Sequence, residues 1–482
     1  MKKTLFALSM ALLFIGGSLK AQDDYYMTGL LPDDGTYDQL PRKFELLSRD
    51  YTALPRKYSL LQYCPEAKSQ GSHGTCTSWA TSYAARTIAE AVKWGWTDKT
   101  KITQESFSPI FVYAQIKTKY DDNCRKGTYI HMALQLLKDK GAPKFSDFNV
   151  LCANDIDSKL YESAQNYKID DYFTLFSYND NNRNDKIRKV KKSLSENCPV
   201  VIAMWLPSTF QSAQRVLNME NVATNFPIKN TEIEGYHAMC VIGYDDDYAG
   251  GAFQIMNSWG ANWGENGFIW VKYADFARCV DQAYELYLKK SHNIKPNPDP
   301  KPNPININDE LYGEITLQLS TGEKMSPIFD KDKQIYRIAG EFVSGTRYRI
   351  YISNNIPAYV YVIGSDMENH VSKVFPPKDN ISAALTYQSN HIAIPDESYY
   401  IEFDNTSGTD YMCILFSKDN LDINTIIHQI KNGSGSFYDE LTSTITGKTA
   451  SRNDIQYLLN DIGFHAVTEK TIVPIFVEMK HK

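Results

Sequence analysis

The chain has 482 residues, 43% of them hydrophobic and 22% charged, which predicts two or three globular domains with enough apolar material for a core. Its formal net charge of −6 argues against a protein that binds nucleic acid by neutralising phosphates. The eight cysteines show no spacing typical of a structural zinc site. We therefore expect no nucleic-acid partner, no metal and no cofactor.

The first residues have the pattern of a secretory signal peptide. Lys2 and Lys3 precede an apolar run over 5–15, and Ala21 is a small residue at the expected cleavage point. The run is too short to span a bilayer stably, and no later stretch reaches 18 uninterrupted apolar residues. We expect 1–21 to be a signal peptide and the protein to be exported without a membrane span, to the periplasm, the cell surface or the medium.

Residues 22–53 form a polar N-terminal leader of mixed composition. The sequence over 40–47 is echoed at 54–61, fourteen residues later. One explanation is coincidence, or two similar docking strands. The other is that the leader is removable or occludes a site, with a basic cut region near Arg56 and Lys57.

From 54 to 292, helical patterns come first and strand patterns follow, which is typical of an α+β domain with two lobes. The predicted helices lie over 76–92, 107–120, 129–140 and 185–195. The predicted strands lie over 200–205, 238–244, 252–256, 268–271 and 283–288.

Alternating prolines mark a boundary at 293–308. They favour an extended, semi-rigid spacer, and a ligand for a proline-binding domain is the alternative. Beyond it, short alternating strands with recurring turn signals predict a β-sandwich-like accessory domain over 309–482. Its predicted strands lie over 314–319, 347–352, 359–363, 411–416 and 471–477, and its predicted helices over 423–430 and 453–460.

One cysteine stands where a nucleophile would be favoured. Cys76 opens a predicted helix, where unpaired N–H groups and the positive end of the dipole favour a thiolate over a thiol. Cysteine catalysis also needs a base, a group that orients the base, and donors for the developing oxyanion. Downstream, His237 opens a predicted strand, and Asn257 follows it.

At this point the chain resembles the papain-like cysteine peptidases. The most specific part is the pattern Asn-Ser-Trp-Gly-x-x-Trp-Gly-x-x-Gly over 257–267, and Cys76, His237 and Asn257 follow the order of that family. The resemblance covers 54–292. It implies a two-lobed α+β fold with a helical lobe and a β-barrel-like lobe.

The resemblance also implies a role for each candidate site residue. Cys76 would attack the peptide carbonyl, His237 would act as its base, and Asn257 would orient the imidazole. Gln70 would donate to the oxyanion, and Trp259 would shield the Asn–His hydrogen bond from water. By family position, the expected substrate-binding residues are Ala203, Trp205, Tyr236 and Trp259.

The chain departs from the family near the nucleophile. His73 stands where typical members have a disulfide-forming cysteine, so we expect it to be structural or to flank the cleft. Cys124 and Cys152 stand at two disulfide positions without their usual partners, and a bridge between them is a hypothesis. The run 124–127 also differs from the Cys-x-Gly-Gly of typical members. The chain thus resembles a divergent, secreted bacterial member.

These patterns together predict an exported cysteine peptidase that acts on peptide or protein substrates. Two alternatives stay open: a binding or adhesion protein with an inactive peptidase-like domain, and a transpeptidase or ligase that uses the same site. The region 309–482 faintly resembles β-rich accessory domains of secreted bacterial proteins. An envelope or extracellular ligand is the partner that this resemblance implies for it.

Overall fold

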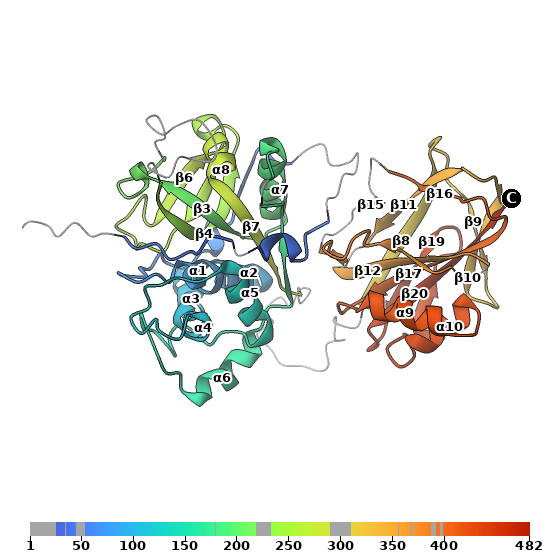
Figure 1. Cartoon of the computed structure of the whole chain (residues 1–482), viewed down its shortest axis with the longest axis horizontal. Helices are drawn as coiled ribbons and strands as arrows, with labels where there is room; N and C mark the ends of the chain where they lie inside the picture. Colours follow the sequence, from blue (N-terminus) through green and yellow to red (C-terminus); the bar gives the residue numbers. More distant parts are fainter. Residues whose placement is uncertain are drawn as a thin grey trace, which may run out of the picture.

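Two bodies make up the chain, a mixed α/β body and a β-rich body (Figure 1). The computed structural model describes residues 26–33, 35–44, 54–178, 180–217, 233–289, 310–354, 356–367, 370–386, 392–395 and 399–482. The predicted signal peptide and the proline-rich spacer lie outside these ranges. Within them, every helix is too short or too polar to cross a lipid bilayer.

The first body begins with a helical lobe built behind Cys76. Its elements are α1 (Cys76–Ser78), a π-helical stretch (Trp79–Arg86), α2 (Thr87–Trp94), α3 (Lys99–Gln104), α4 (Pro109–Ile116), α5 (Ile130–Asp139) and α6 (Ser158–Ala164). Asp98 and Ser108 cap α3 and α4 by accepting from backbone N–H groups, and Gly95 ends α2 in the left-handed conformation. The helices α1–α2, α4 and α5 confirm those predicted here.

The second lobe is built on a seven-stranded sheet in the order β2-β7-β3-β4-β5-β6, with β1 beside β4. Its elements are β1 (Lys57–Ser59), β2 (Asp171–Thr174), α7 (Arg183–Ser195), β3 (Val200–Pro207), β4 (Ile233–Asp245), β5 (Ala252–Met256), β6 (Phe268–Lys272), α8 (Tyr273–Cys279) and β7 (Val280–Tyr287). Central strands β3 and β5 are almost wholly buried, which accounts for their continuous apolar runs. The predicted two-lobed α+β fold is confirmed.

Two sheets enclose the core of the second body. One has the order β13-β12-β17-β20-β10-β9 with β14 on β12, and the other β15-β11-β8-β19-β18 with β16 on β11. The strands are β8 (Glu310–Leu319), β9 (Pro327–Asp330), β10 (Ile335–Phe342), β11 (Arg347–Ser353), β12 (Ala358–Ser365), β13 (Ser372–Phe375), β14 (Ala384–Leu385), β15 (Ile392–Ile394), β16 (Ile401–Glu402), β17 (Gly408–Ser417), β18 (Ile455–Tyr457), β19 (Ile462–Val467) and β20 (Ile472–His481). This β-rich, sandwich-like architecture agrees with the prediction.

One predicted helix of this body is wrong. The helix α9 (Ile423–Asn432) is where the periodicity placed it, but the next helix is α10 (Phe437–Thr444), and residues 455–457 form strand β18. That strand pairs antiparallel with β19, from Ile455 opposite Ala466 to Tyr457 opposite Phe464. Pairing with a neighbouring strand decides the conformation of so short a segment, and the local pattern does not.

The two bodies touch directly. Tyr359 of β12 donates a 3.0 Å hydrogen bond to the carboxylate of Asp171 on β2, and both residues are buried. Phe173 and Tyr287 of the first body belong to one apolar cluster with side chains of the second. Lys289 and Asp419 add an exposed ion pair at 2.9 Å.

Candidate active site

Cys76 begins α1 at the junction of the two lobes and is fully buried. Burial raises the pKa of its thiol to about 12, although backbone N–H groups of Ala238, Gly29, Thr77 and Cys76 itself act in the opposite direction. Ala238 follows His237 on β4, so the sulfur lies against the part of β4 that carries the candidate base. In this state the thiol is neutral.

His237 and Asn257 are joined by a hydrogen bond. Asn257 Oδ1 lies 2.8 Å from His237 Nε2, and the ring of Trp259 lies 4.8 Å from the imidazole. Burial lowers the pKa of His237 to about 4, and the bond to Asn257 offsets only part of that. Among the described residues His237 Nδ1 has no hydrogen-bond partner, which leaves this nitrogen to serve a thiol. Because the amide oxygen of Asn257 can only accept, this hydrogen bond places the imidazole proton on Nε2 and leaves Nδ1 unprotonated.

Gln70 is fully buried, and its amide is held at both ends. Ser258 donates a 2.6 Å hydrogen bond to Gln70 Oε1, so Nε2 is turned to donate to carbonyl oxygens. It donates to His73 O at 2.6 Å and to Met27 O at 3.1 Å. Ser258 was not among the predicted site residues; its only signal in the sequence is its place beside Asn257.

Leader residues occupy the site, which the sequence did not reveal. The carbonyl oxygen of Met27 accepts hydrogen bonds from Gln70 Nε2 and from Trp259 Nε1, both at 3.1 Å. Tyr26 stacks on the indole of Trp259 with ring centres 4.9 Å apart and planes at 11°. A peptide carbonyl of the chain itself therefore contacts the candidate oxyanion donor.

The leader continues along the cleft and bonds to it through its backbone. Thr128 donates to Gly29 O at 3.0 Å and accepts from Leu31 N at 3.1 Å, and Leu30 N donates to Tyr236 O at 3.3 Å. Gly29 is required by space, because a Cβ there would lie 2.0 Å from the carbonyl oxygen of Gly74. Both walls of the cleft thus bond to the backbone of 29–31.

The expected substrate-binding residues lie on adjacent strands. Ala203 is buried on β3 opposite Ala238, and Tyr236 lies on β4. Tyr236 stacks on Trp205 at 4.1 Å, and both donate hydrogen bonds to the buried carboxyl of Asp281. Burial raises the pKa of Asp281 to about 6, while these bonds lower it. Asp281 was not among the predicted site residues, because it stands in no local motif.

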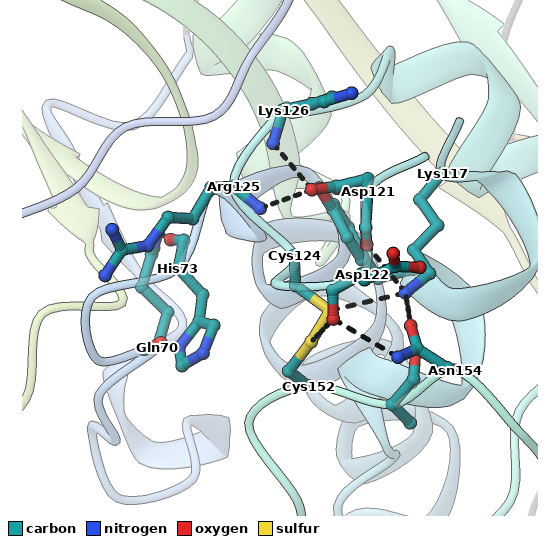
Figure 2. Close-up of a disulfide and its surroundings, with 12 residues drawn as sticks. Gln70, His73, Lys117, Asp121, Asp122, Cys124, Arg125, Lys126, Cys152 and Asn154 are labelled. Carbon is teal, nitrogen blue, oxygen red and sulfur yellow. Dashed lines mark hydrogen bonds between the residues drawn. A yellow bond between two sulfur atoms is a disulfide. The ribbon is translucent and has the colours of Figure 1, made fainter. Parts of the chain in front are cut away.

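A disulfide anchors the loop that forms one wall of the cleft (Figure 2). Cys124 and Cys152 are bonded, with Cα atoms 5.7 Å apart, which confirms the hypothesised bridge. Buried Asp121 holds the same loop. Its Oδ1 accepts from Arg125 N at 2.7 Å and Lys126 N at 3.1 Å.

The network continues into the helical lobe. Tyr113 of α4 donates to Asp121 Oδ2 at 2.6 Å and accepts from Gly127 N at 3.1 Å. Figure 2 shows His73 beside Gln70 and apart from the disulfide, and its Nδ1 lies 3.3 Å from Gln70 O. His73 therefore contacts the backbone of the segment that carries Gln70.

Comparison with known proteins identifies both bodies. Residues 56–287 match the family described as papain family cysteine protease, and residues 341–420 match a domain of unknown function, DUF4384. A probable cysteine protease RD21B of Arabidopsis thaliana is 24% identical over 240 residues, which are 49% of this chain and 46% of that protein. The cysteine proteinase RD21A of the same plant is 20% identical over 240 residues, again 49% and 46%. This chain thus spans about half the length of these relatives.

Solved structures are similar over the same region. Xylellain, a cysteine protease from Xylella fastidiosa, is 23% identical with a TM-score of 0.42, and the match covers 55% of this chain and 96% of that one. Digestive procathepsin L 3 of the Tenebrio molitor larval midgut is 18% identical with a TM-score of 0.39, covering 52% and 77%. The family models thus assign a papain-family cysteine protease domain to residues 56–287 and a DUF4384 domain to residues 341–420 of this chain.

Proposed function

We propose that the chain is an exported cysteine peptidase that hydrolyses peptide bonds of peptides or proteins. The observation that carries the proposal is the bound carbonyl of Met27, which accepts from Gln70 and Trp259 within the same site as Cys76, His237 and Asn257. Such a site binds a peptide backbone. The Cys124–Cys152 disulfide is typical of proteins outside the cytoplasm and supports export.

In the proposed reaction, the sulfur of Cys76 attacks the carbonyl carbon of the scissile bond while His237 holds the proton of the thiol. The oxyanion accepts from Gln70 Nε2, and each donor of this kind is worth on the order of 10²–10³ in rate. His237 then protonates the leaving amine, and a thioester remains on Cys76. Water, deprotonated by His237, releases the acyl group as a carboxylic acid, and Asn257 orients the imidazole throughout.

The state described here is latent. Leader residues 26–31 fill the cleft, and burial keeps the Cys76 thiol and the His237 imidazole neutral. Departure of the leader admits water, so that the charged thiolate–imidazolium pair becomes stable. The leader, predicted to be removable or occluding, therefore acts as an occluding segment. The basic cut region suggested by the sequence near Arg56 and Lys57 lies at the start of β1, which is paired with β4.

Covalent labelling tests the proposal. The probe is a thiol-directed epoxide, and the protein is the full chain with Gly29→Val, because a side chain there collides with Gly74 and displaces the leader. We expect one adduct, on Cys76, and cleavage of a peptide library. Adding Cys76→Ser should lower the rate of cleavage by about 10³-fold or more. Cys64→Ser is the matched control, since Cys64 is another buried free cysteine, outside the cleft.

Two results would count against hydrolysis. A folded Gly29→Val protein with no adduct on Cys76 and no cleavage would favour a binding protein with an inactive domain. Products in which the acyl group is joined to an added amine, with no free carboxylic acid, would favour the transpeptidase or ligase.

A further inference from the structure

The leader continues beyond the cleft and is anchored on strand β7 of the protease domain. Tyr37 is fully buried, and its hydroxyl donates to Ala283 O at 3.3 Å and accepts from Ala283 N at 3.0 Å. Its ring contacts that of Tyr284 edge-on at 5.2 Å. This residue of the leader therefore completes the hydrogen bonding of β7 at that position.

Residues 41–43 bind the edge of the protease sheet. Lys43 N donates to Thr174 O at 2.9 Å, and Thr174 N donates to Pro41 O at 3.0 Å. The ammonium group of Lys43 contacts both carboxylate oxygens of Glu285 at 2.7 Å, with both side chains buried. The leader thus extends this sheet beyond β2.

The opposite edge of the same segment binds the C-terminal domain. Arg42 N donates to Asn380 O, and Arg42 O accepts from Ser382 N, each at 2.7 Å. Arg42 is therefore bridged to Thr174 on one side and to Ile381 on the other. One extended residue joins a sheet of the protease domain to a loop of the domain of unknown function.

Phe44 adds an apolar anchor. Its side chain is only 8% exposed and belongs to the core of the C-terminal domain, where it meets Phe375 edge-on at 4.8 Å. A buried aromatic side chain in a packed core is the kind of contact that dominates the energy of an interface. Figure 1 shows the dark-blue leader running along the protease body toward the C-terminal body.

These contacts bear on the cleft because the chain is continuous from Tyr26 to Phe44, apart from one undescribed position at 34. An anchored peptide rebinds its own site at a high effective concentration, so anchoring lowers the time that the cleft stands open. The same cleft segment without the distal anchor would dissociate more often.

We propose that the C-terminal domain carries a docking surface, formed by residues 375–382, for the leader of its own chain, and that docking of 42–44 there keeps 26–31 in the cleft. The inference rests on the proposed function. The domain of unknown function then holds the inhibitory leader in place, and we call its docking surface over 375–382 the clasp. The substrate cleft and the clasp are then two ends of one intramolecular complex.

The test uses the full chain with Phe44→Asp. A buried charge without a partner is unfavourable, so we expect residues 42–44 to leave the C-terminal domain. The substitution changes no residue within that domain itself. We expect the Ser382 amide to lose hydrogen-exchange protection and the epoxide to label Cys76 about tenfold faster or more, which corresponds to ~1.4 kcal/mol. Phe44→Leu keeps an apolar anchor and should label within threefold of wild type.

The outcomes separate the two proposals. If Phe44→Asp exposes Ser382 while Leu30 and Leu31 stay protected and labelling stays at the wild-type rate, the protease domain alone holds the leader and the clasp is overturned. Unchanged protection at all three amides also overturns it. Gly29→Val reports on the site itself: if it labels and cleaves while Phe44→Asp does not label, only the clasp fails. If neither variant labels, the proposed function fails.

Discussion

Ser258 decides how the Gln70 amide is turned. Its hydroxyl donates a hydrogen bond to Gln70 Oε1. This bond directs Gln70 Nε2 toward the position now held by the carbonyl oxygen of Met27. An amide without this partner can rotate, and its donor is then present in the correct direction for only part of the time. Ser258 is thus a positioning residue in the proposed mechanism.

We expect Ser258→Ala in the Gly29→Val background to lower kcat about tenfold, because a hydrogen bond of this kind is worth ~0.5–1.5 kcal/mol, and to leave KM within about twofold. Steady-state kinetics on a peptide found in the library screen measure both constants. Ser258→Thr keeps the hydroxyl and is the control that should recover most of kcat. A purely structural role would instead lower stability and leave kcat of the folded enzyme unchanged.

The lowered pKa of His237 predicts how acid affects latency. The imidazole titrates near 4 in the closed state and near ~6.5 when hydrated, so the open state binds the proton more tightly. The contribution of His237 to the stability of the closed state is therefore complete above about pH 6.5. As pH falls from there toward 4, the equilibrium constant for closing decreases by at most about tenfold per pH unit.

The measurement is the epoxide labelling rate of wild type divided by that of Gly29→Val, from pH 7 to pH 4. The division removes the intrinsic pH dependence of the thiol, and we expect the ratio to rise with acidity. A constant ratio would contradict this prediction. Global unfolding is a poorer readout, because Asp281, with its pKa raised to about 6, contributes with the opposite sign.

At the scale of elements, the cleft wall 124–128 is a loop held from outside the cleft. Asp121 binds two of its amides, Tyr113 binds a third, and the disulfide joins its first residue to Cys152. The backbone groups of Thr128, which pair with the leader, are the ones that a substrate strand would use in the proposed function.

We expect Asp121→Ala in the Gly29→Val background to raise KM about fivefold or more, with kcat within about twofold, because losing hydrogen bonds to a charged group costs on the order of 1.5–3 kcal/mol in loop order. Asp122→Ala is the matched control, since Asp122 is the adjacent exposed carboxylate. Equal KM values for the two variants would show that the loop keeps its shape without Asp121.

Some helices and strands could be predicted from their local sequence pattern, and others could not. The helices with a clear apolar face, α5 and α9, follow the 3.6-residue period and were predicted from it. The stretch 453–460 was predicted as a helix and contains strand β18, because a three-residue segment takes its conformation from the partner β19. Strand β2 was missed, since its four residues are buried on both faces and do not alternate.

At the scale of the whole molecule, two ion pairs show the difference between the leader contact and an ordinary surface contact. Lys43 and Glu285 are 5% and 0% exposed, whereas Lys289 and Asp419, which also join distant segments, are 44% and 54% exposed. Burial lowers the pKa of Lys43, but Glu285 and Glu196 outweigh it and the net shift is upward. The buried Lys43 ammonium group is therefore charged.

We expect Lys43→Met to lower the free energy of unfolding by about 3–5 kcal/mol, because it leaves the Glu285 carboxylate buried without its partner. Lys289→Met is the control and should cost less than about 1 kcal/mol. Urea unfolding of the full chain followed by circular dichroism measures both. Similar losses for the two variants would mean that the Lys43 contact is hydrated in solution.

The amino-acid sequence predicted the order of domains, the two-lobed α+β class and the candidate site residues Gln70, Cys76, His237 and Asn257. It could do so because helix and strand periods are local, and because the site residues stand in short, specific patterns. The segment that occupies the site, and the contacts that hold it there, became visible only in the folded structure. The contacts of Met27 with Trp259 and of Arg42 with Asn380 join segments more than two hundred residues apart. Such pairings depend on how finished domains pack, and no local periodicity records them.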